Sequence, residues 1–202
     1  MCAIGGFQTM ASDTGSARIK GSVLITRLNL VRKHGGPERL QKVLGRLPPP
    51  DREVLEGILL PISWYPLELN LRLDAAIADV LSPADRTKAF LEMGRASAEE
   101  NLAGPHHVFL RHGDPHFLLS HTSEIYRLYY AVGSRSYEKT GERGAILRTV
   151  DAQSVTEADC LTIIGWHQRA IELSGGKDVR ITHPTCRARG GPHCEYLCTW
   201  KL

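Results

Sequence analysis

The stretch CLTIIGWHQRAIELSGGKDVRITHPTCRARGGPHCEYLCTW, residues 160–200, determines how we expect this chain to fold. It contains Cys160, His183, Cys186 and Cys194, with 22, 2 and 7 residues between them. Thiolate and imidazole are the groups that structural zinc sites use, and three Cys with one His close a tetrahedral shell. The sequence Arg-Gly-Gly-Pro at 189–192 predicts a turn that brings Cys186 close to Cys194.

The spacing leaves other roles for these cysteines open. Free cysteine behaves as a small hydrophobic residue and is often buried. A disulfide framework is disfavoured because the chain has five cysteines, is long enough to form a core and shows no secretion signal. Cys198 is an alternative to His183 as the fourth ligand, and Cys2 is too close to the end of the chain to be assigned.

The chain resembles the 4-vinyl reductase domain over residues 85–200. This small-molecule-binding module occurs in phenol-responsive bacterial transcription activators and also alone. The residues that carry the resemblance are Gly165, Trp166, Leu173, Gly175, Gly176, Val179, Ile181, Cys186, Gly190, Cys194, Tyr196 and Trp200. The whole chain also resembles a family of similar length and unknown function, present as many paralogues in myxobacteria, which implies no activity.

The first resemblance implies a structural zinc ion. Zinc-bearing members of that domain place a Cys on a helix, then an acidic residue, a Cys three residues later and a last Cys eight beyond that. Cys160, Cys186 and Cys194 match these positions, and His183 stands where the acidic ligand would be. Histidine is a competent zinc ligand, so a histidine in place of the acidic residue is compatible with a zinc site.

The composition describes an ordinary globular protein. Of 202 residues, 42% are hydrophobic and 23% charged, and the net charge of +3 is too small to predict nucleic-acid binding. The basic residues are scattered, no apolar run reaches the length of a membrane span, and no signal peptide is recognisable. We therefore expect a cytoplasmic protein with neither nucleic acid nor membrane as partner.

The periodicity predicts an α+β fold, with an antiparallel sheet of four to five strands covered by helices and an N-terminal part that is mostly helical. Residues 1–18 are expected to be loose, 19–84 to form the N-terminal strand and helical part, and 85–202 to form the ligand-binding domain, the last two as one compact unit. We expect strands at 21–31, 134–139, 145–150, 178–185 and 193–200. We expect helices at 37–47, 51–60, 64–80, 82–101, 114–132 and 156–174.

The resemblance also implies a pocket between the sheet and the helices, close to the zinc, for a small hydrophobic or aromatic molecule. Counting back from Cys160 places its polar positions near His112 and Tyr137, and Tyr126 and Tyr129 lie on a helix expected to line it. The alternative is that these tyrosines are ordinary core residues. The five histidines between residues 106 and 121 are expected to form a solvated loop, with His121 in the core.

Haem is disfavoured by the sequence. The resembled domain is distantly similar in architecture to haem nitric-oxide sensors, which hold iron through a His on the helix before the sheet. The comparable helix here offers Tyr126. The Tyr-x-Ser-x-Arg signature of those sensors is also missing, because Tyr130, Ser134 and Arg135 have a different spacing.

The motifs for common enzymes are missing. The chain has no G-x-G-x-x-G sequence, no P-loop and no G-x-S-x-G elbow. We therefore expect a non-enzymatic, zinc-stabilised sensory module in bacterial signalling that acts through a protein partner or as a homodimer. The alternative is an interaction or scaffold protein without a small ligand, because the fold is also similar to vesicle-tethering subunits. An internal cavity distinguishes the two.

Overall fold

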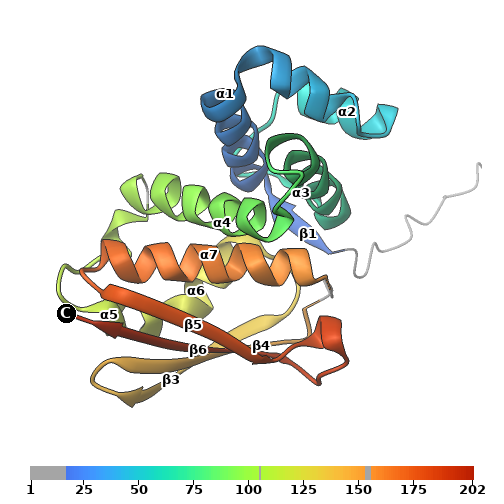
Figure 1. Ribbon diagram of the computed structural model, residues 1–202. Helices are drawn as coiled ribbons and strands as arrows, with labels where there is room; N and C mark the ends of the chain where they lie inside the picture. Colours follow the sequence, from blue (N-terminus) through green and yellow to red (C-terminus); the bar gives the residue numbers. More distant parts are fainter. Residues whose placement is uncertain (1–16, 105, 153–155) are drawn as a thin grey trace, which may run out of the picture.

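The computed structural model describes residues 17–104, 106–152 and 156–202, and it confirms the expected α+β architecture. Three layers follow one another in Figure 1: the N-terminal helices, two long helices side by side, and a sheet. Most of residues 1–18, which were expected to be loose, and Cys2 lie outside the described residues. Within the described ranges, no helix has both the length and the apolar character needed to cross a membrane.

The sheet has four antiparallel strands in the order β3-β4-β6-β5. These strands are β3 (Ser134–Gly141), β4 (Gly144–Val150), β5 (Lys177–Thr185) and β6 (Cys194–Lys201), all close to their predicted positions. Alternate residues of β6 are buried, as expected for a strand with one face against a core. These buried residues are Cys194, Tyr196, Cys198 and Trp200.

The predicted strand at residues 21–31 is wrong, because this segment begins the helix α1 (Gly21–Leu44). Leu24, Leu28 and Val31 recur at helical spacing and are fully buried, so burial against the neighbouring helices decides the structure over β-propensity. The helix predicted from Pro37 does exist, since Gly36 interrupts α1 with a φ of 65°.

A short strand precedes α1. It is β1 (Arg18–Lys20), which pairs antiparallel with β2 (Trp64–Pro66). Residues 64–66 were expected to open a helix, which instead begins three residues later as α3 (Leu67–Leu81). The pairing ties the start of the described chain to the segment that leads into α3.

Two further helices begin at residues other than those predicted. α2 (Pro49–Glu56) starts at the prolines, so Asp51 lies in its first turn and not at its cap; its carboxylate binds Arg72 of α3, with 2.5 Å between Oδ2 and Nε. α4 (Arg86–Ala103) starts after Asp85, whose carboxylate accepts a hydrogen bond from a backbone N–H of the first turn.

The helix predicted at 114–132 is divided in two. α5 (Pro115–Ser120) and α6 (Thr122–Tyr129) meet at His121, which is half-buried and whose Nδ1 lies 2.8 Å from the Phe117 carbonyl oxygen. Asp114 caps α5 by accepting a hydrogen bond from the backbone N–H of Phe117. After the break, α6 packs against β3 and lies below α7 in Figure 1.

The long helices α4 and α7 (Glu157–Leu173) pack backbone to backbone. A methyl group on Gly94 would overlap the carbonyl oxygen of Thr162, and one on Gly165 would overlap that of Leu91. Arg95 and Glu172 add an ion pair along the contact, with 2.8 Å between Nη2 and Oε2. This pair of helices connects the N-terminal layer to the sheet, and both candidate sites described below include residues of α7.

Candidate metal centre and ligand cavity

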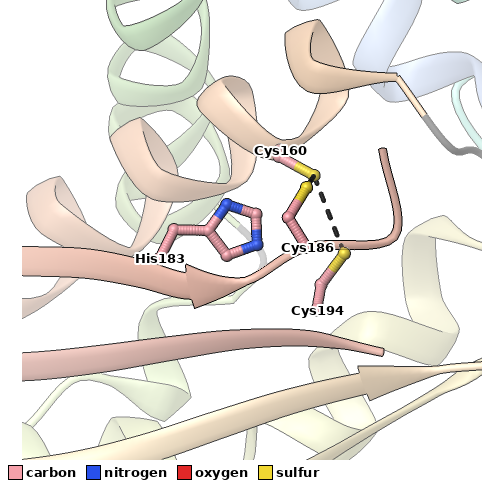
Figure 2. A group of neighbouring side chains, drawn as sticks. All are labelled: Cys160, His183, Cys186 and Cys194. Carbon is pink, nitrogen blue, oxygen red and sulfur yellow. Dashed lines mark hydrogen bonds between the residues drawn. The ribbon is translucent and has the colours of Figure 1, made fainter. Parts of the chain in front are cut away.

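The four predicted metal ligands meet at one end of the sheet (Figure 2). Cys160 comes from the first turns of α7, His183 from β5, Cys186 from the residue after β5, and Cys194 from the start of β6. Their ligand atoms all lie within 4.8 Å of one another, and the three cysteines are buried. The structure therefore brings together residues that are up to 34 positions apart in the chain.

The distances between the sulfur atoms match a metal shell. Cys160 Sγ lies 3.8 Å from Cys186 Sγ and 3.8 Å from Cys194 Sγ. A disulfide would need about 2.05 Å. With a Zn–S bond of about 2.3 Å, two sulfurs at the corners of a tetrahedron are about 3.8 Å apart. The four described cysteines are free thiols, so a disulfide framework is not what this arrangement forms.

His183 presents an unused nitrogen to the sulfurs. Its Nε2 is buried and has no hydrogen-bond partner among the described residues, and its ring stacks on Tyr196 with 4.4 Å between centroids. Burial, with a further contribution from Arg189, lowers the pKa of His183. The imidazole is therefore neutral, as a metal ligand must be.

The hairpin between β5 and β6 holds the two cysteines in place. Gly190 adopts a φ of 83°, and the backbone N–H of Gly191 donates to the Cys186 carbonyl oxygen over 2.8 Å. The backbone N–H of Arg187 points at Cys194 Sγ, at 3.4 Å. An N–H that donates to a sulfur favours the thiolate form, which is the form that binds metals.

Cys198 does not compete for the fourth position. It is buried within β6 and is not part of the cluster of ligand atoms. Burial raises the pKa of its thiol to about 12. His183, and not Cys198, is therefore the residue that lies with the three clustered cysteines.

A cavity of about 60 Å³ lies between the helices and the sheet. Its walls come from α1, α4, α6, α7 and the start of β3. Two of the four predicted pocket residues, Tyr126 and Tyr129, line it. The full lining is Val23, Arg27, Gly94, Ser97, Asn101, Thr122, Ile125, Tyr126, Tyr129, Tyr130, Arg135, Thr162, Ile163, Trp166 and His167.

Some polar groups on the cavity wall have hydrogen-bond partners and others have none among the described residues. The Tyr126 hydroxyl donates to the Val132 carbonyl oxygen over 2.8 Å, whereas the Tyr129 hydroxyl has no partner among the described residues. Arg135 is buried, its Nε donates to Thr149 Oγ1 over 3.0 Å, and its Nη2 has no partner in the described part of the chain. Buried donors without a partner are rare in native proteins, so these two are candidates to bind a ligand.

His167 is the imidazole on this wall. Its Nδ1 lies 2.8 Å from the Ile163 carbonyl oxygen and its Nε2 lies 3.5 Å from Arg135 Nη1. Burial first, and the Arg135 guanidinium second, lower the pKa of His167 to about 3. The ring is therefore neutral, with Nδ1–H donating to the backbone and Nε2 accepting from Arg135.

The other two predicted pocket residues lie elsewhere. His112 is exposed in the loop before α5, near Gly175. Tyr137 is half-buried on β3, and its hydroxyl is 2.8 Å from Nδ1 of His116, which in turn packs against Trp200. Within the described ranges, the His-rich segment brings together no group of potential metal ligands.

A second, smaller cavity of about 20 Å³ borders the cluster. Cys160 and Cys194, two of the clustered residues, line it together with Tyr196. Tyr126, Tyr130 and Ile163 line both cavities. A movement of α6 or α7 that alters one cavity would therefore alter the wall of the other.

Sequence reasoning missed Arg135 as a site residue. Its signal was present, because Arg135 and Tyr137 alternate with Ser136 and Glu138, which places a guanidinium on the inward face of β3. A charged residue at an inward position of a strand is rare unless it has a partner or a function. His167 is fully buried on α7, and its place beside Arg135 could not be read from the sequence.

The fold is similar to that of H-NOX domains. An H-NOX protein from S. oneidensis in the Fe(II)NO ligation state has a TM-score of 0.71 at 15% identity, covering 91% of this chain and 99% of that one. The Fe(II) unliganded H-NOX protein from K. algicida gives 0.66 at 13%, covering 91% and 97%. The solution structure of an H-NOX domain from Shewanella oneidensis in the Fe(II)CO state gives 0.68 at 16%, covering 90% and 98%.

These neighbours correct the expectation of zinc as cofactor with haem disfavoured. Two of them are described in Fe(II) states and others of the same fold by their heme, so the cofactor of these neighbours is haem and not zinc. The described residues do not fit haem in this conformation. The cavity of about 60 Å³ is several-fold below the roughly 300–1,000 Å³ of cofactor sites, and both nitrogens of His167 are engaged.

Two further comparisons concern the sequence. None of the curated proteins matches this chain. A family model described as a protein of unknown function, DUF2378, matches residues 52–201. That range runs from within α2 to the end of β6 and includes all four clustered ligands and most of the cavity wall. The chain belongs to the DUF2378 family.

Proposed function

We propose that this protein is a non-enzymatic small-molecule-binding sensory module in bacterial signalling. The observation that supports this most directly is the cavity between the helices and the sheet, whose wall carries a buried guanidinium and a buried hydroxyl, each with a donor that has no partner among the described residues. Buried polar groups without a partner lower the stability of a protein and are rare in cores that serve only to hold the fold together. The likeness to H-NOX domains supports the same class of function.

We further propose that the Cys160, His183, Cys186 and Cys194 cluster binds a zinc ion that stabilises the module. Three thiolates and an imidazole suit Zn²⁺, and four protein ligands leave no position for a reactive water. The ion would join the start of α7 to the β5–β6 hairpin. Free thiols fit a reducing cytoplasm, which is where we place the protein.

The resemblance to the 4-vinyl reductase domain agrees with this proposal. It implies a ligand between sheet and helices and a metal close by, and the proposal is supported by a cavity between these layers and by the cluster of three cysteines and one histidine. The signal would leave through a protein partner or a second copy of the chain. The second cavity offers a route, because Tyr126, Tyr130 and Ile163 belong to both walls.

The ligand-binding function can be tested by filling the cavity. Ile125 on α6 lines it and is buried, whereas Leu128 on the same helix is 38% exposed. A thermal-shift screen of small molecules, with haemin included, should find compounds that raise the melting temperature of the native protein and of Leu128→Phe but not of Ile125→Phe. Compounds that stabilise all three proteins equally would not be cavity ligands, and a screen without any hit would contradict the proposal.

The metal site can be tested with cobalt. Co²⁺ in a tetrahedral thiolate site gives intense visible absorption, so loading the protein with Co²⁺ should produce these bands and adding Zn²⁺ should remove them. His183→Ala should change their position while Cys198→Ala leaves them unchanged, because Cys198 is outside the cluster. An octahedral, weakly coloured spectrum would contradict a closed site of three cysteines and one histidine.

A second candidate function is an interaction protein without a small ligand. The observation that favours it is the exposure of large apolar side chains after α2, where Ile58 is 89% and Ile62 is 82% exposed. Exposed apolar groups close together mark sites of protein association. An oligomer in sedimentation experiments that Ile58→Glu and Ile62→Glu dissociate, together with no cavity ligand, would favour this function over the first.

A further inference from the structure

The cavity contains two arginines in opposite states. Arg27 of α1 is saturated: its Nε is 2.7 Å from Asp74 Oδ1, and its Nη1 donates to Ser97 Oγ and to the Met93 carbonyl oxygen. Arg135 is equally buried but has no carboxylate partner within the described residues. The same wall therefore carries one guanidinium that is neutralised and one that is not.

Within the described residues, no carboxylate forms an ion pair with Arg135. Asp74 is held by Arg27, and Asp159 accepts a hydrogen bond from the Tyr130 hydroxyl over 3.3 Å. What Arg135 does contact are a hydroxyl, an imidazole and aromatic rings, with its guanidinium carbon 4.8 Å from the centre of the Tyr126 ring. These contacts position the guanidinium but do not neutralise it, and an uncompensated buried charge is strongly unfavourable.

We propose that the cavity binds a short carboxylate, whose charged group pairs with Arg135 Nη2 and accepts a hydrogen bond from the Tyr129 hydroxyl. Both groups line the cavity, both are buried, and both lack a partner among the described residues. A guanidinium fits the planar, two-oxygen geometry of a carboxylate. His167 cannot take this role, because its Nε2 accepts from Arg135 and its Nδ1–H is used.

The apolar residues of the lining indicate the chemistry of the other end of the ligand. Val23, Ile125 and Ile163 are apolar, so the other end of the ligand is a short hydrocarbon. A water needs about 10–15 Å³ of such space, so a cavity of about 60 Å³ accepts on the order of four to six non-hydrogen atoms. Butyrate, with a carboxylate and a three-carbon chain, has that size. This inference rests on the proposed ligand-binding function and specifies its ligand class.

The test measures binding of sodium butyrate to the purified full chain by isothermal titration, with butyramide as a neutral probe of the same shape and inorganic phosphate as an anion without an apolar end. Butyrate should bind, and butyramide and phosphate should bind about tenfold or more weakly, because each lacks one half of the recognition. Arg135→Met should weaken butyrate binding by about tenfold or more. Tyr129→Phe, which removes only an unpaired hydroxyl, should weaken it several-fold without loss of folding.

The matched control is Arg148→Met. Arg148 lies on the adjacent strand β4 but is paired with Glu138 and Glu195 on the outer face of the sheet, so butyrate should bind this variant as it binds the native chain. Equal affinity for butyrate and butyramide, or unchanged butyrate affinity in both Arg135→Met and Tyr129→Phe, would overturn the carboxylate assignment. If neutral compounds bind and Ile125→Phe blocks them, the ligand-binding function stands and only the ligand class fails. If no small molecule binds, so that water alone occupies the cavity, both proposals fail.

Discussion

The metal cluster and the cavity both contain buried polar atoms without partners, but they differ in how completely the chain encloses them. In the cluster, His183 Nε2 and three sulfurs converge on one point at distances that suit a single ion. In the cavity, Arg135 Nη2 and the Tyr129 hydroxyl border a space that holds several atoms. The first arrangement specifies its occupant almost fully and suits a permanent part of the fold, whereas the second suits a ligand that exchanges.

The largest expected effect is the loss of a cluster ligand. Cys186→Ala should destabilise the protein by about 5 kcal/mol or more, because the binding free energy of a structural zinc ion is folding free energy, on the order of 10 kcal/mol in small zinc domains. Cys198→Ala is the matched control, since it removes an equally buried thiol outside the cluster. Metal content and melting temperature measured together should fall in the first variant, with only the melting temperature falling in the second. Equal stability of Cys186→Ala and the native chain would show that the cysteines are ordinary core residues.

The next largest effect is expected from a substitution in α7, which contributes to both the cluster and the cavity. Gly165→Ala places a methyl group against the carbonyl oxygen of Leu91, so α7 must move away from α4, and we expect a loss of about 2–4 kcal/mol in the free energy of unfolding. Gly141→Ala at the tip of β3 meets nothing within 4 Å and should cost less than about 1 kcal/mol. Urea denaturation of the two variants checks this difference. A tolerated Gly165→Ala would mean that the close helix contact is not required.

The stability of the protein should also depend on pH through His167, which lines the cavity. Its folded pKa is about 3, against 6.5 for an unperturbed imidazole, so below pH 6.5 the unfolded chain binds a proton that the folded chain does not. Stability therefore falls as the pH falls, by up to about 2 kcal/mol between pH 6 and 4.5. His167→Gln should lose this part of the pH dependence, whereas the exposed His34→Gln should retain it. Identical pH profiles of unfolding for the two variants would contradict a buried neutral His167.

The smallest effect compares two tyrosines of α6. Tyr126→Phe removes a hydroxyl that donates to the Val132 carbonyl oxygen and should cost about 1 kcal/mol. Tyr129→Phe removes a hydroxyl without a described partner, so the ligand-free protein should be unchanged or more stable by up to about 1 kcal/mol. Melting temperatures of the two variants in the absence of added ligand decide the matter. A larger loss in Tyr129→Phe than in Tyr126→Phe would mean that its hydroxyl is already satisfied.

The C-terminal half was well predicted because its signals are local. The Thr140–Gly144 turn, the cap at Thr156 and the glycines after α7 each fix an element boundary through backbone chemistry, and the structure has those boundaries within a few residues. The N-terminal error at residues 21–31 has the opposite origin. Leu24, Leu28 and Val31 satisfy a helical stripe as well as the β-branched residues nearby satisfy a strand, and contacts with α3 make the choice.

The two sites differ in the same way. The cluster could be predicted from residue type and spacing, since thiolates and imidazole have few structural uses together. The cavity could not, because it depends on how five elements leave a gap between them. Tyr126 and Tyr129 were found through their helix, but His112 and Tyr137 were placed by counting along the chain, which fails once a helix breaks, as it does at His121.

The most direct test of the account is a pair of mass spectra of the purified protein, recorded under native and denaturing conditions. The account predicts a native mass in excess by one zinc ion, lost on denaturation, and a further small adduct that Ile125→Phe does not retain. An excess equal to haem would show that the cavity opens to hold the cofactor of the H-NOX fold. A native mass equal to the bare polypeptide would contradict the central claim that this fold is built around a metal ion and a ligand.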